Sequence, residues 1–328
     1  MLIVATVLCV AVPTMAPVAK ATFPGKNGRV AFSYGGHFPS GCGAPVIMTI
    51  NPNDKAIRTL TDCGDLADPI ELAPDWAPKG RRILFTRDYG SAARIEVMKA
   101  DGSREHEVPL SRLPPGTPQR SDAYVSDASY SPDGKHFVYT RYFARNGDNA
   151  RSELWVAAID GSGDRRLQRA GRVPHWSPNG RLIAYTSPEV PGDSAASDIG
   201  TWVINPRTGR RVRIARRPVQ LLDWSPDSRR LLYLGPNRLL VMRANGSGRR
   251  RLPSIPLVAY LGDASFSPNG RRIAVSGTRR YRDGEQQHAI WTMTVGGTQR
   301  RQIYAGVRVI DLDWGPPSGL SWQARSNR

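Results

Sequence analysis

The sequence contains few cysteines and lacks the short motifs that identify common enzymes. Only three of its 328 residues are cysteine, and no Cys-x-x-Cys pair or nearby histidine pair suggests a zinc site. A Gly-x-Ser-x-Gly nucleophile elbow and the Ser-x-Asp-x-Gly-x-Thr-Trp box of sialidases are both absent. Long amphipathic helical stretches are missing as well. The chain has instead 32 glycines and 27 prolines, a composition typical of many turns.

The charge is strongly unbalanced, with 46 basic and 28 acidic residues and a formal net charge of +18. Most basic residues are arginines, many of them in scattered pairs, and the longest run is Arg249-Arg250-Arg251. No RNA-binding signature or zinc-finger spacing accompanies them, so nucleic acid is not an expected partner. We interpret them as solvated turn and edge-strand residues that discourage sheet aggregation. Binding of an anionic polymer is the alternative that the net charge favours.

The beginning of the chain is typical of an export signal. Residues 2–12 form an apolar run that is too short to span a bilayer, and Ala19-Lys20-Ala21 provides the small-x-small pattern that precedes a cleavage site. We therefore predict a signal peptide at residues 1–21 and a single domain at 22–328. The expected location is secreted or in the cell envelope, with no transmembrane span after leader removal, and the expected state is a monomer. Because no basic residue precedes the apolar run, a retained anchor is the alternative.

Two cysteines, Cys42 and Cys63, remain after removal of that segment. An even number in an exported chain predicts one disulfide. The bridge would close a loop of about 20 residues and contribute roughly 3 kcal/mol to stability. Two free thiols are the alternative.

The main signal is an internal repeat of eleven residues. Each copy has an aromatic residue, then a Ser-Pro-Asp-Gly-like turn, then an apolar run; the copies lie at residues 75–85, 129–139, 175–185, 223–233 and 265–275. Half copies occur at 26–32 and 313–316, and the aromatic residues are 42 to 54 positions apart. This is the period of a four-stranded propeller blade.

The pattern has a direct physical interpretation. Asp-Gly and Asn-Gly supply the positive φ of tight hairpins, the proline ends a strand, and the aromatic side chain buries a large area between sheets. A second strand–turn–strand pattern follows each copy, so the two patterns agree on six units. We predict an all-β, six-bladed β-propeller with four-stranded antiparallel blades. The N- and C-terminal strands pair to close the ring, and we expect the last strand at about residues 306–314.

The repeated Trp-Ser-Pro-(Asp/Asn)-Gly-x-x-Ile-Ala-(Phe/Tyr) unit resembles the TolB-like, WD-repeat-like propeller family. The resemblance covers about residues 26–316 and implies the six-bladed fold. It implies no particular activity, because one propeller architecture hosts many functions. The propeller that gates prolyl-oligopeptidase-type hydrolases has similar repeats, but there the catalytic domain is separate.

The predicted inner strands carry the candidate binding residues. Asp75, Asp223 and Asp313 immediately precede the repeat aromatic, and His175 is equivalent to them. Asp127, Asp263 and Asp311 precede the aromatic by three residues, and side chains alternate with period two along a strand. We expect all seven side chains to share one strand face and to form an acidic channel mouth. The alternatives are hydrogen bonds to turn backbone within each blade and a divalent cation in the central channel.

These observations favour an exported, non-enzymatic scaffold that binds a protein or cell-envelope component through the channel mouth and loops. We predict no catalytic residues and no cofactor, and the identity of any metal stays open. The first alternative is a channel-centred, metal-dependent hydrolase or lyase. The second is a binder of anionic polymers.

Overall fold

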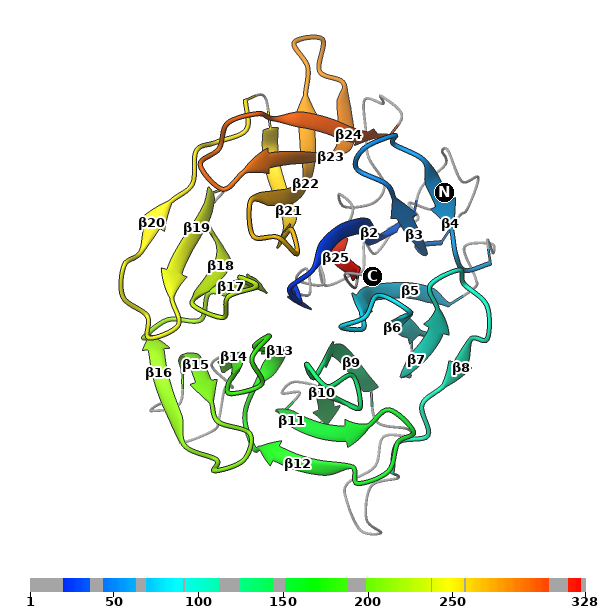
Figure 1. The fold of residues 1–328 in the computed structure, drawn as a ribbon, viewed down its shortest axis with the longest axis vertical. Coiled ribbons are helices and arrows are strands. Elements are labelled where there is room, and N and C mark those ends of the chain that lie inside the picture. The colour runs from blue at the N-terminus through cyan, green and yellow to red at the C-terminus, as the bar shows by residue number, and fades with distance from the viewer. Residues whose placement is uncertain are drawn as a thin grey trace, which may run out of the picture.

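The computed structural model describes ten stretches of the chain: residues 20–35, 44–62, 69–90, 92–111, 124–143, 151–187, 199–236, 238–256, 258–306 and 318–325. Their strands form six sheets that stand around a ring like the blades of a propeller (Figure 1). No helix occurs within these stretches. The predicted all-β, six-bladed fold is confirmed.

The first three blades, written from the inner to the outer strand, are as follows. Blade 1 consists of β25 (Ser318–Arg325), β2 (Lys26–Tyr34), β3 (Val46–Ile50) and β4 (Ile57–Thr59). Blade 2 consists of β5 (Ile70–Trp76), β6 (Arg82–Asp88), β7 (Ala93–Lys99) and β8 (His106–Glu107). Blade 3 consists of β9 (Tyr124–Tyr130), β10 (His136–Phe143), β11 (Arg151–Ala158) and β12 (Arg165–Gln168).

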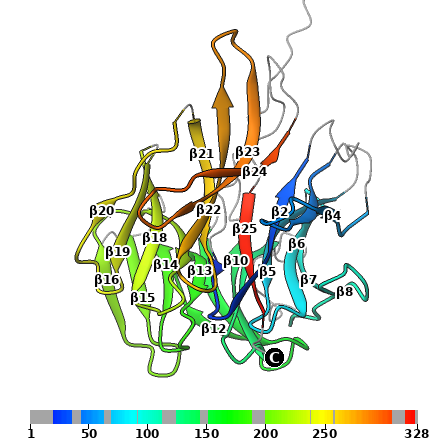
Figure 2. The same cartoon turned by 45° about the horizontal axis from the view of Figure 1, so that its top comes forward.

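The other three blades follow in chain order. Blade 4 consists of β13 (Arg172–Trp176), β14 (Ile183–Ser187), β15 (Gly200–Ile204) and β16 (Arg211–Ala215). Blade 5 consists of β17 (Gln220–Trp224), β18 (Arg230–Gly235), β19 (Arg238–Arg243) and β20 (Arg250–Arg251). Blade 6 consists of β21 (Val258–Phe266), β22 (Arg272–Arg280), β23 (Gln286–Thr294) and β24 (Arg301–Ala305). The β22–β23 hairpin projects beyond the body of the ring (Figures 1 and 2).

The Ser-Pro-Asp-Gly turn is stabilised by its own side chains. In blade 3 the Ser131 hydroxyl accepts a hydrogen bond from the His136 backbone N–H at 3.0 Å, and the Asp133 carboxylate accepts one from the Lys135 N–H at 2.8 Å. Gly134 has a φ of 67°, which a side chain would strain. Blade 5 has Ser228 at the same position with a φ of 58°. The repeat therefore encodes the hairpin between the two inner strands of a blade.

The ring is closed within blade 1 by chain segments from opposite ends. Strand β25 pairs antiparallel with β2, so that Val30 lies opposite Trp322; Figure 1 shows the two strands side by side near the centre of the ring. The predicted range of the closing strand was wrong, because residues 318–325 rather than 306–314 form it. Trp322 supplies the buried aromatic residue, but no proline and glycine follow it, so the repeat pattern does not reveal this strand.

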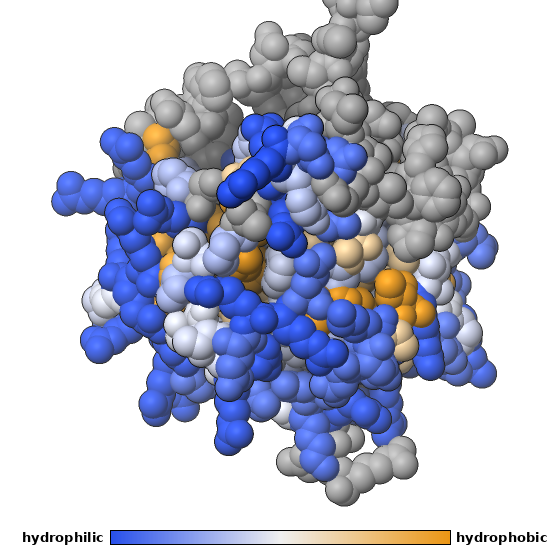
Figure 3. Space-filling model, turned by 90° about the horizontal axis from the view of Figure 1, so that it is seen from above, coloured by the Kyte–Doolittle hydropathy of each residue, from blue (hydrophilic) through white to orange (hydrophobic). Residues whose placement is uncertain are grey.

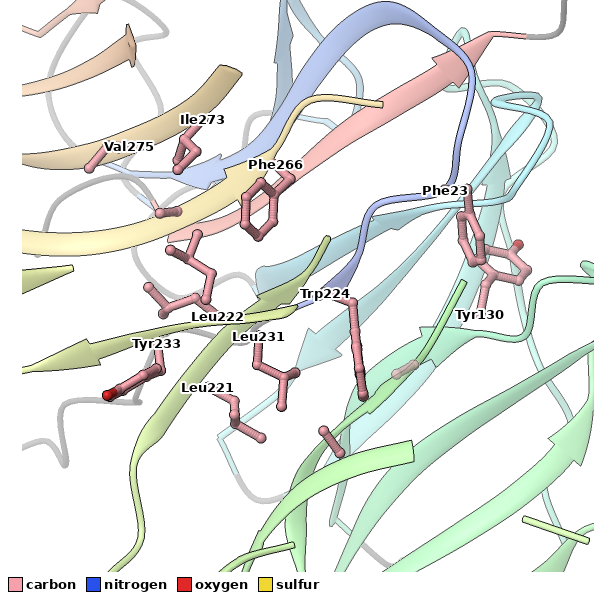
Figure 4. Packing of buried hydrophobic residues seen from close by; sticks show 14 of the residues in the cluster. Phe23, Tyr130, Leu221, Leu222, Trp224, Leu231, Tyr233, Phe266, Ile273 and Val275 are labelled. Atoms are coloured by element: carbon pink, nitrogen blue, oxygen red, sulfur yellow. The ribbon is translucent and has the colours of Figure 1, made fainter. Parts of the chain in front are cut away.

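The hydrophobic core lies between the blades. Trp76, Trp224 and Phe266, which are repeat aromatics, are at most 1% exposed. Figure 4 shows Trp224 and Phe266 among the apolar side chains of blades 5 and 6, and Phe23 against Tyr130 of blade 3. Burial of such large side chains is the main favourable contribution to packing one sheet against the next.

Candidate functional site

The inner strands do not keep the simple alternation on which the predicted channel mouth depends. The pairing register shifts in β5 between Leu72 and Asp75, in β9 between Ser126 and Ser129, and in β13 between Arg172 and His175. Ala73, Asp127 and Val173 have positive φ values of 57°, 59° and 54° within these irregularities. Each is a β-bulge, which re-aims the side chains around it. The residue directly before the aromatic and the one two positions earlier are therefore not related by a regular two-residue period.

In four of the six blades, the residue before the aromatic joins two successive blades instead. Asp75 accepts a hydrogen bond from the backbone N–H of Tyr130 at 2.9 Å, and Asp223 accepts one from the N–H of Phe266 at 2.6 Å. Ser129 and Ser321 accept the equivalent bonds at the other junctions, from the N–H groups of Trp176 at 3.2 Å and Trp76 at 3.1 Å. These four hydrogen bonds join four pairs of neighbouring blades. The bonds cross between blades, whereas the sequence suggested bonds within each blade.

The other described candidates are also buried. Asp263 is 1% exposed and accepts a hydrogen bond from the Leu320 N–H at 2.8 Å, which joins blade 6 to blade 1. Asp127 accepts one from the Tyr142 hydroxyl at 3.1 Å. His175 has no exposed surface, and its carbonyl oxygen accepts a bond from the Trp224 indole at 3.0 Å.

Several sequence-based predictions concern residues outside the described stretches. These are the candidate carboxylates Asp311 and Asp313 and the predicted disulfide partners Cys42 and Cys63. Ligand binding at the predicted channel mouth stays a prediction. Within the described parts of the chain, no group of three or more His, Cys, Asp or Glu side chains is arranged to hold a metal ion.

Residues just before β2 lie at the centre of the ring. The short strand β1 (Lys20–Ala21) pairs parallel with β17, and it also contacts β9, β13 and β25. Thr22 and Phe23, which follow it, are only 2% and 4% exposed. The inner surface of the ring is therefore filled partly by the chain's own N-terminal segment, a feature that the repeat pattern does not predict.

A different surface feature, two adjacent cavities, lies where blade 6 meets blade 1. The larger has a volume of about 280 Å³, and the smaller of about 190 Å³. Asn27, Gly28 and Asn53 line both of them, so they form one continuous depression, which we call the seam groove. Its position depends on ring closure, because β25 and β2 both contribute to its walls.

Five arginines line the seam groove: Arg29, Arg58 and Arg325 in the larger cavity, and Arg272 and Arg301 in the smaller. Among the described lining residues none is acidic, and the other polar side-chain groups are amides, a threonine hydroxyl and the Trp322 indole. Guanidinium groups are suited to planar, bidentate binding of carboxylate and phosphate. The groove therefore has the chemistry of a site for an anionic ligand.

Neutral oxygens hold the two half-buried arginines of the groove. Arg29 donates to the Thr49 hydroxyl at 2.9 Å and to the Thr49 carbonyl at 3.0 Å. Arg272 donates to the Gln299 carbonyl at 2.8 Å and to the Thr292 hydroxyl at 3.1 Å. Burial and the neighbouring Arg58 lower the pKa of Arg29, while the nearby Asp54 opposes the shift, and the guanidinium remains charged at neutral pH. These bonds orient the guanidinium groups without neutralising them.

In the sequence these arginines belong only to a scattered set of basic residues. They come from opposite ends of the chain, so their spacing along the sequence carries no signal of a common site. The face of the molecule in Figure 3 is likewise mostly hydrophilic, with small separate hydrophobic areas.

Comparison with known proteins identifies the fold. No family model matches the chain. TolB from Acinetobacter baumannii superposes with a TM-score of 0.62 at 17% identity, over 92% of this chain and 68% of that one. A putative TolB from Agrobacterium tumefaciens gives a TM-score of 0.61 at 16% identity, over 80% and 89%. The chain has a TolB-like β-propeller fold.

The curated relatives of this TolB-like propeller are longer proteins. Dipeptidyl-peptidase 5 of Trichophyton equinum is 24% identical over 269 residues, which cover 76% of this chain and 34% of the relative. The chain thus spans about a third of the length of the curated relatives it matches. In the described part of the TolB-like propeller, no helix is long and apolar enough to cross a membrane.

Proposed function

We propose that this TolB-like propeller is an extracytoplasmic, non-enzymatic scaffold that binds an anionic cell-envelope component at the seam groove. The observation that carries the proposal is the set of five arginines around one depression whose described lining contains no carboxylate. The predicted signal peptide supports the location. The ligand presents at least two oxyanion groups, because the arginines are divided between two connected cavities.

The inner strands support a scaffold over a hydrolase or lyase. Asp75 and Asp223 accept backbone hydrogen bonds that join neighbouring blades, and both have no exposed surface. A catalytic carboxylate must reach its substrate within hydrogen-bond distance. Carboxylates engaged in this way serve ring assembly, whereas the seam groove is a polar depression lined in part by exposed arginines.

The test is a binding titration of the protein that begins at Thr22, with tripolyphosphate and citrate as separate phosphate and carboxylate probes. We expect binding that weakens as salt is raised, because charge attraction drives it. In the double variant Arg58→Gln/Arg325→Gln, both of whose arginines are exposed, affinity should fall at least tenfold.

The matched control is Arg207→Gln/Arg210→Gln in the β15–β16 hairpin of blade 4. It removes the same charge from an exposed surface outside the groove. We expect it to retain most of the affinity. Equal losses in the two variants would show that overall charge, and not the groove, attracts the anion. Absence of binding to both probes would refute the proposal.

A further inference from the structure

The carboxylate of Asp223 lies at the centre of the ring in an unusual environment. It has no exposed surface, and its oxygens accept hydrogen bonds from the Thr22 N–H at 2.9 Å, the Thr22 hydroxyl at 2.7 Å, the Ser265 hydroxyl at 3.1 Å and the Phe266 N–H at 2.6 Å. All of these donors are neutral, and the contacts described for this carboxylate include no cation. Burial raises the pKa of Asp223 well above its usual range, although these hydrogen bonds oppose the shift.

Thr22 is held at this place by its own contacts. Besides the two bonds to Asp223, its hydroxyl oxygen lies 2.9 Å from the Phe266 carbonyl oxygen. Phe23 then packs into the large core cluster against Tyr130 (Figure 4). Strand β1 also pairs with β17 directly before Thr22. Once cleavage removes β1, the contacts of residues 22 and 23 with blades 3, 5 and 6 are the ones that hold the Thr22 nitrogen.

The bond that precedes this nitrogen is the predicted leader cleavage site. Ala19-Lys20-Ala21 has the small-x-small pattern, so the cut falls between Ala21 and Thr22. Hydrolysis adds one water molecule, which leaves a carboxylate on Ala21 and a free amine on Thr22. At neutral pH an unperturbed α-amino group is largely protonated. Cleavage thus converts the neutral N–H that is 2.9 Å from Asp223 into a cation at the same position.

We infer that Asp223 is the binding site for the free α-ammonium group of the processed chain. Removal of the leader places a positive charge against a fully buried carboxylate, and the resulting pair anchors the N-terminal segment to blades 5 and 6. A buried charge without a partner is strongly destabilising, whereas a hydrogen-bonded pair is tolerated. The inference is independent of the seam groove and of any ligand that the protein binds.

The test compares four purified proteins: chains that begin at Thr22 or at Ala21, each with Asp223 or with Asp223→Asn. A cleavable fusion partner can generate both starts. At pH 7 the Thr22 chain should melt about 5 °C or more above the Ala21 chain when Asp223 is present. The gap should shrink to about 1 °C in the Asp223→Asn pair. No gap with Asp223, or an equal gap without it, would overturn the inference.

The control variant is Ser265→Ala, which removes a neutral donor from the same carboxylate. It should lower the melting temperature of both chain starts by the same amount, because it does not interact with the charge of the new terminus. A gap between the two starts that disappears in Ser265→Ala would contradict a specific charge pair.

A second measurement applies even if Asp223→Asn fails to fold. The folded Thr22 chain is treated with an amine-acetylating reagent, and the modified sites are quantified by mass spectrometry. The α-amine should react at least tenfold more slowly than in the unfolded chain, while the exposed Lys26 should react readily in both. Equal α-amine reactivity in folded and unfolded protein would refute the inference. So would an exported protein whose first residue is not Thr22.

Discussion

Two parts of the ring use arginine in different ways. Residues 70–168, which form blades 2 and 3, contain 15 basic and 14 acidic side chains, whereas residues 169–328 contain 26 and 10. In blade 2, Arg87 contacts Glu96 at 2.8 Å, Glu71 at 3.2 Å and Glu105 at 2.5 Å. The seam groove, by contrast, holds its half-buried arginines through carbonyl and hydroxyl oxygens.

Blade 3 contains the most buried of these ion pairs. Arg141 contacts Asp164 at 3.0 Å, with side chains only 1% and 2% exposed, and it stacks 4.3 Å from the Trp155 ring. The difference teaches that a large net charge does not by itself indicate a function. Ion pairs with carboxylates stabilise blades 2 and 3 internally, whereas arginines bonded to neutral oxygens keep a charge that no direct partner among the described residues compensates.

The largest expected effect comes from breaking the buried pair. Arg141→Met leaves the buried carboxylate of Asp164 without its cation, and we expect the free energy of unfolding to fall by about 3 kcal/mol or more. Urea denaturation measures this fall in the free energy of unfolding. The matched control is Arg94→Gln, which breaks the exposed pair with Glu107 at 2.9 Å and should cost less than about 1 kcal/mol. Similar losses in the two variants would remove the distinction between structural and surface pairs.

A smaller effect is expected from the pH response of blade 2. Burial raises the pKa of Glu71 to about 7, although Thr61 and Arg87 oppose the shift. The folded state therefore keeps a proton that the unfolded state loses, and this contribution to stability is complete below the ordinary glutamate range and lost as pH rises toward 7.

The measurement is the difference in unfolding free energy between the wild type and Glu71→Gln from pH 4 to pH 8. The variant should gain stability relative to the wild type as pH rises, because a neutral amide does not ionise. A difference that is constant with pH would contradict a raised pKa at Glu71 and would suggest that Arg87 keeps all of its carboxylates ionised.

The smallest expected effect on stability concerns the exposed arginines of the seam groove. Arg58→Gln/Arg325→Gln should change the free energy of unfolding by no more than about 0.5 kcal/mol, because both side chains are exposed. Thermal unfolding in the absence of anions measures this change. A loss as large as that of Arg141→Met would mean that the seam arginines are structural, like those of blade 3.

Most of the fold can be predicted from the sequence, because a hairpin is a local structure. The turn of residues 131–136 is specified by Ser131, Asp133 and Gly134, which lie within four positions of one another. The closing strand was assigned to the wrong residues for the same reason. Trp322 has the required aromatic ring but not the turn residues that make the other copies recognisable.

The candidate site was less predictable. The sequence indicates that acidic residues and a histidine recur on inner strands, but β-bulges change the directions of their side chains. Asp75 and Ser129 occupy the same position of the repeat but differ in residue type. Each accepts a hydrogen bond from the backbone N–H of the next blade's aromatic residue. A pattern search treats these two residues as different, although the backbone N–H groups that they bind are equivalent in the two blades.

The sequence by itself determined the six repeats, the turn chemistry and the excess of positive charge. Only the tertiary structure decided which charges meet. Arg29 and Arg325 line one cavity because ring closure pairs β2 with β25, and the Thr22 nitrogen lies against Asp223 although the two residues are 201 positions apart. Local patterns specify strands and turns, because their interactions span a few residues, but contacts between distant segments arise only when the blades close into a ring.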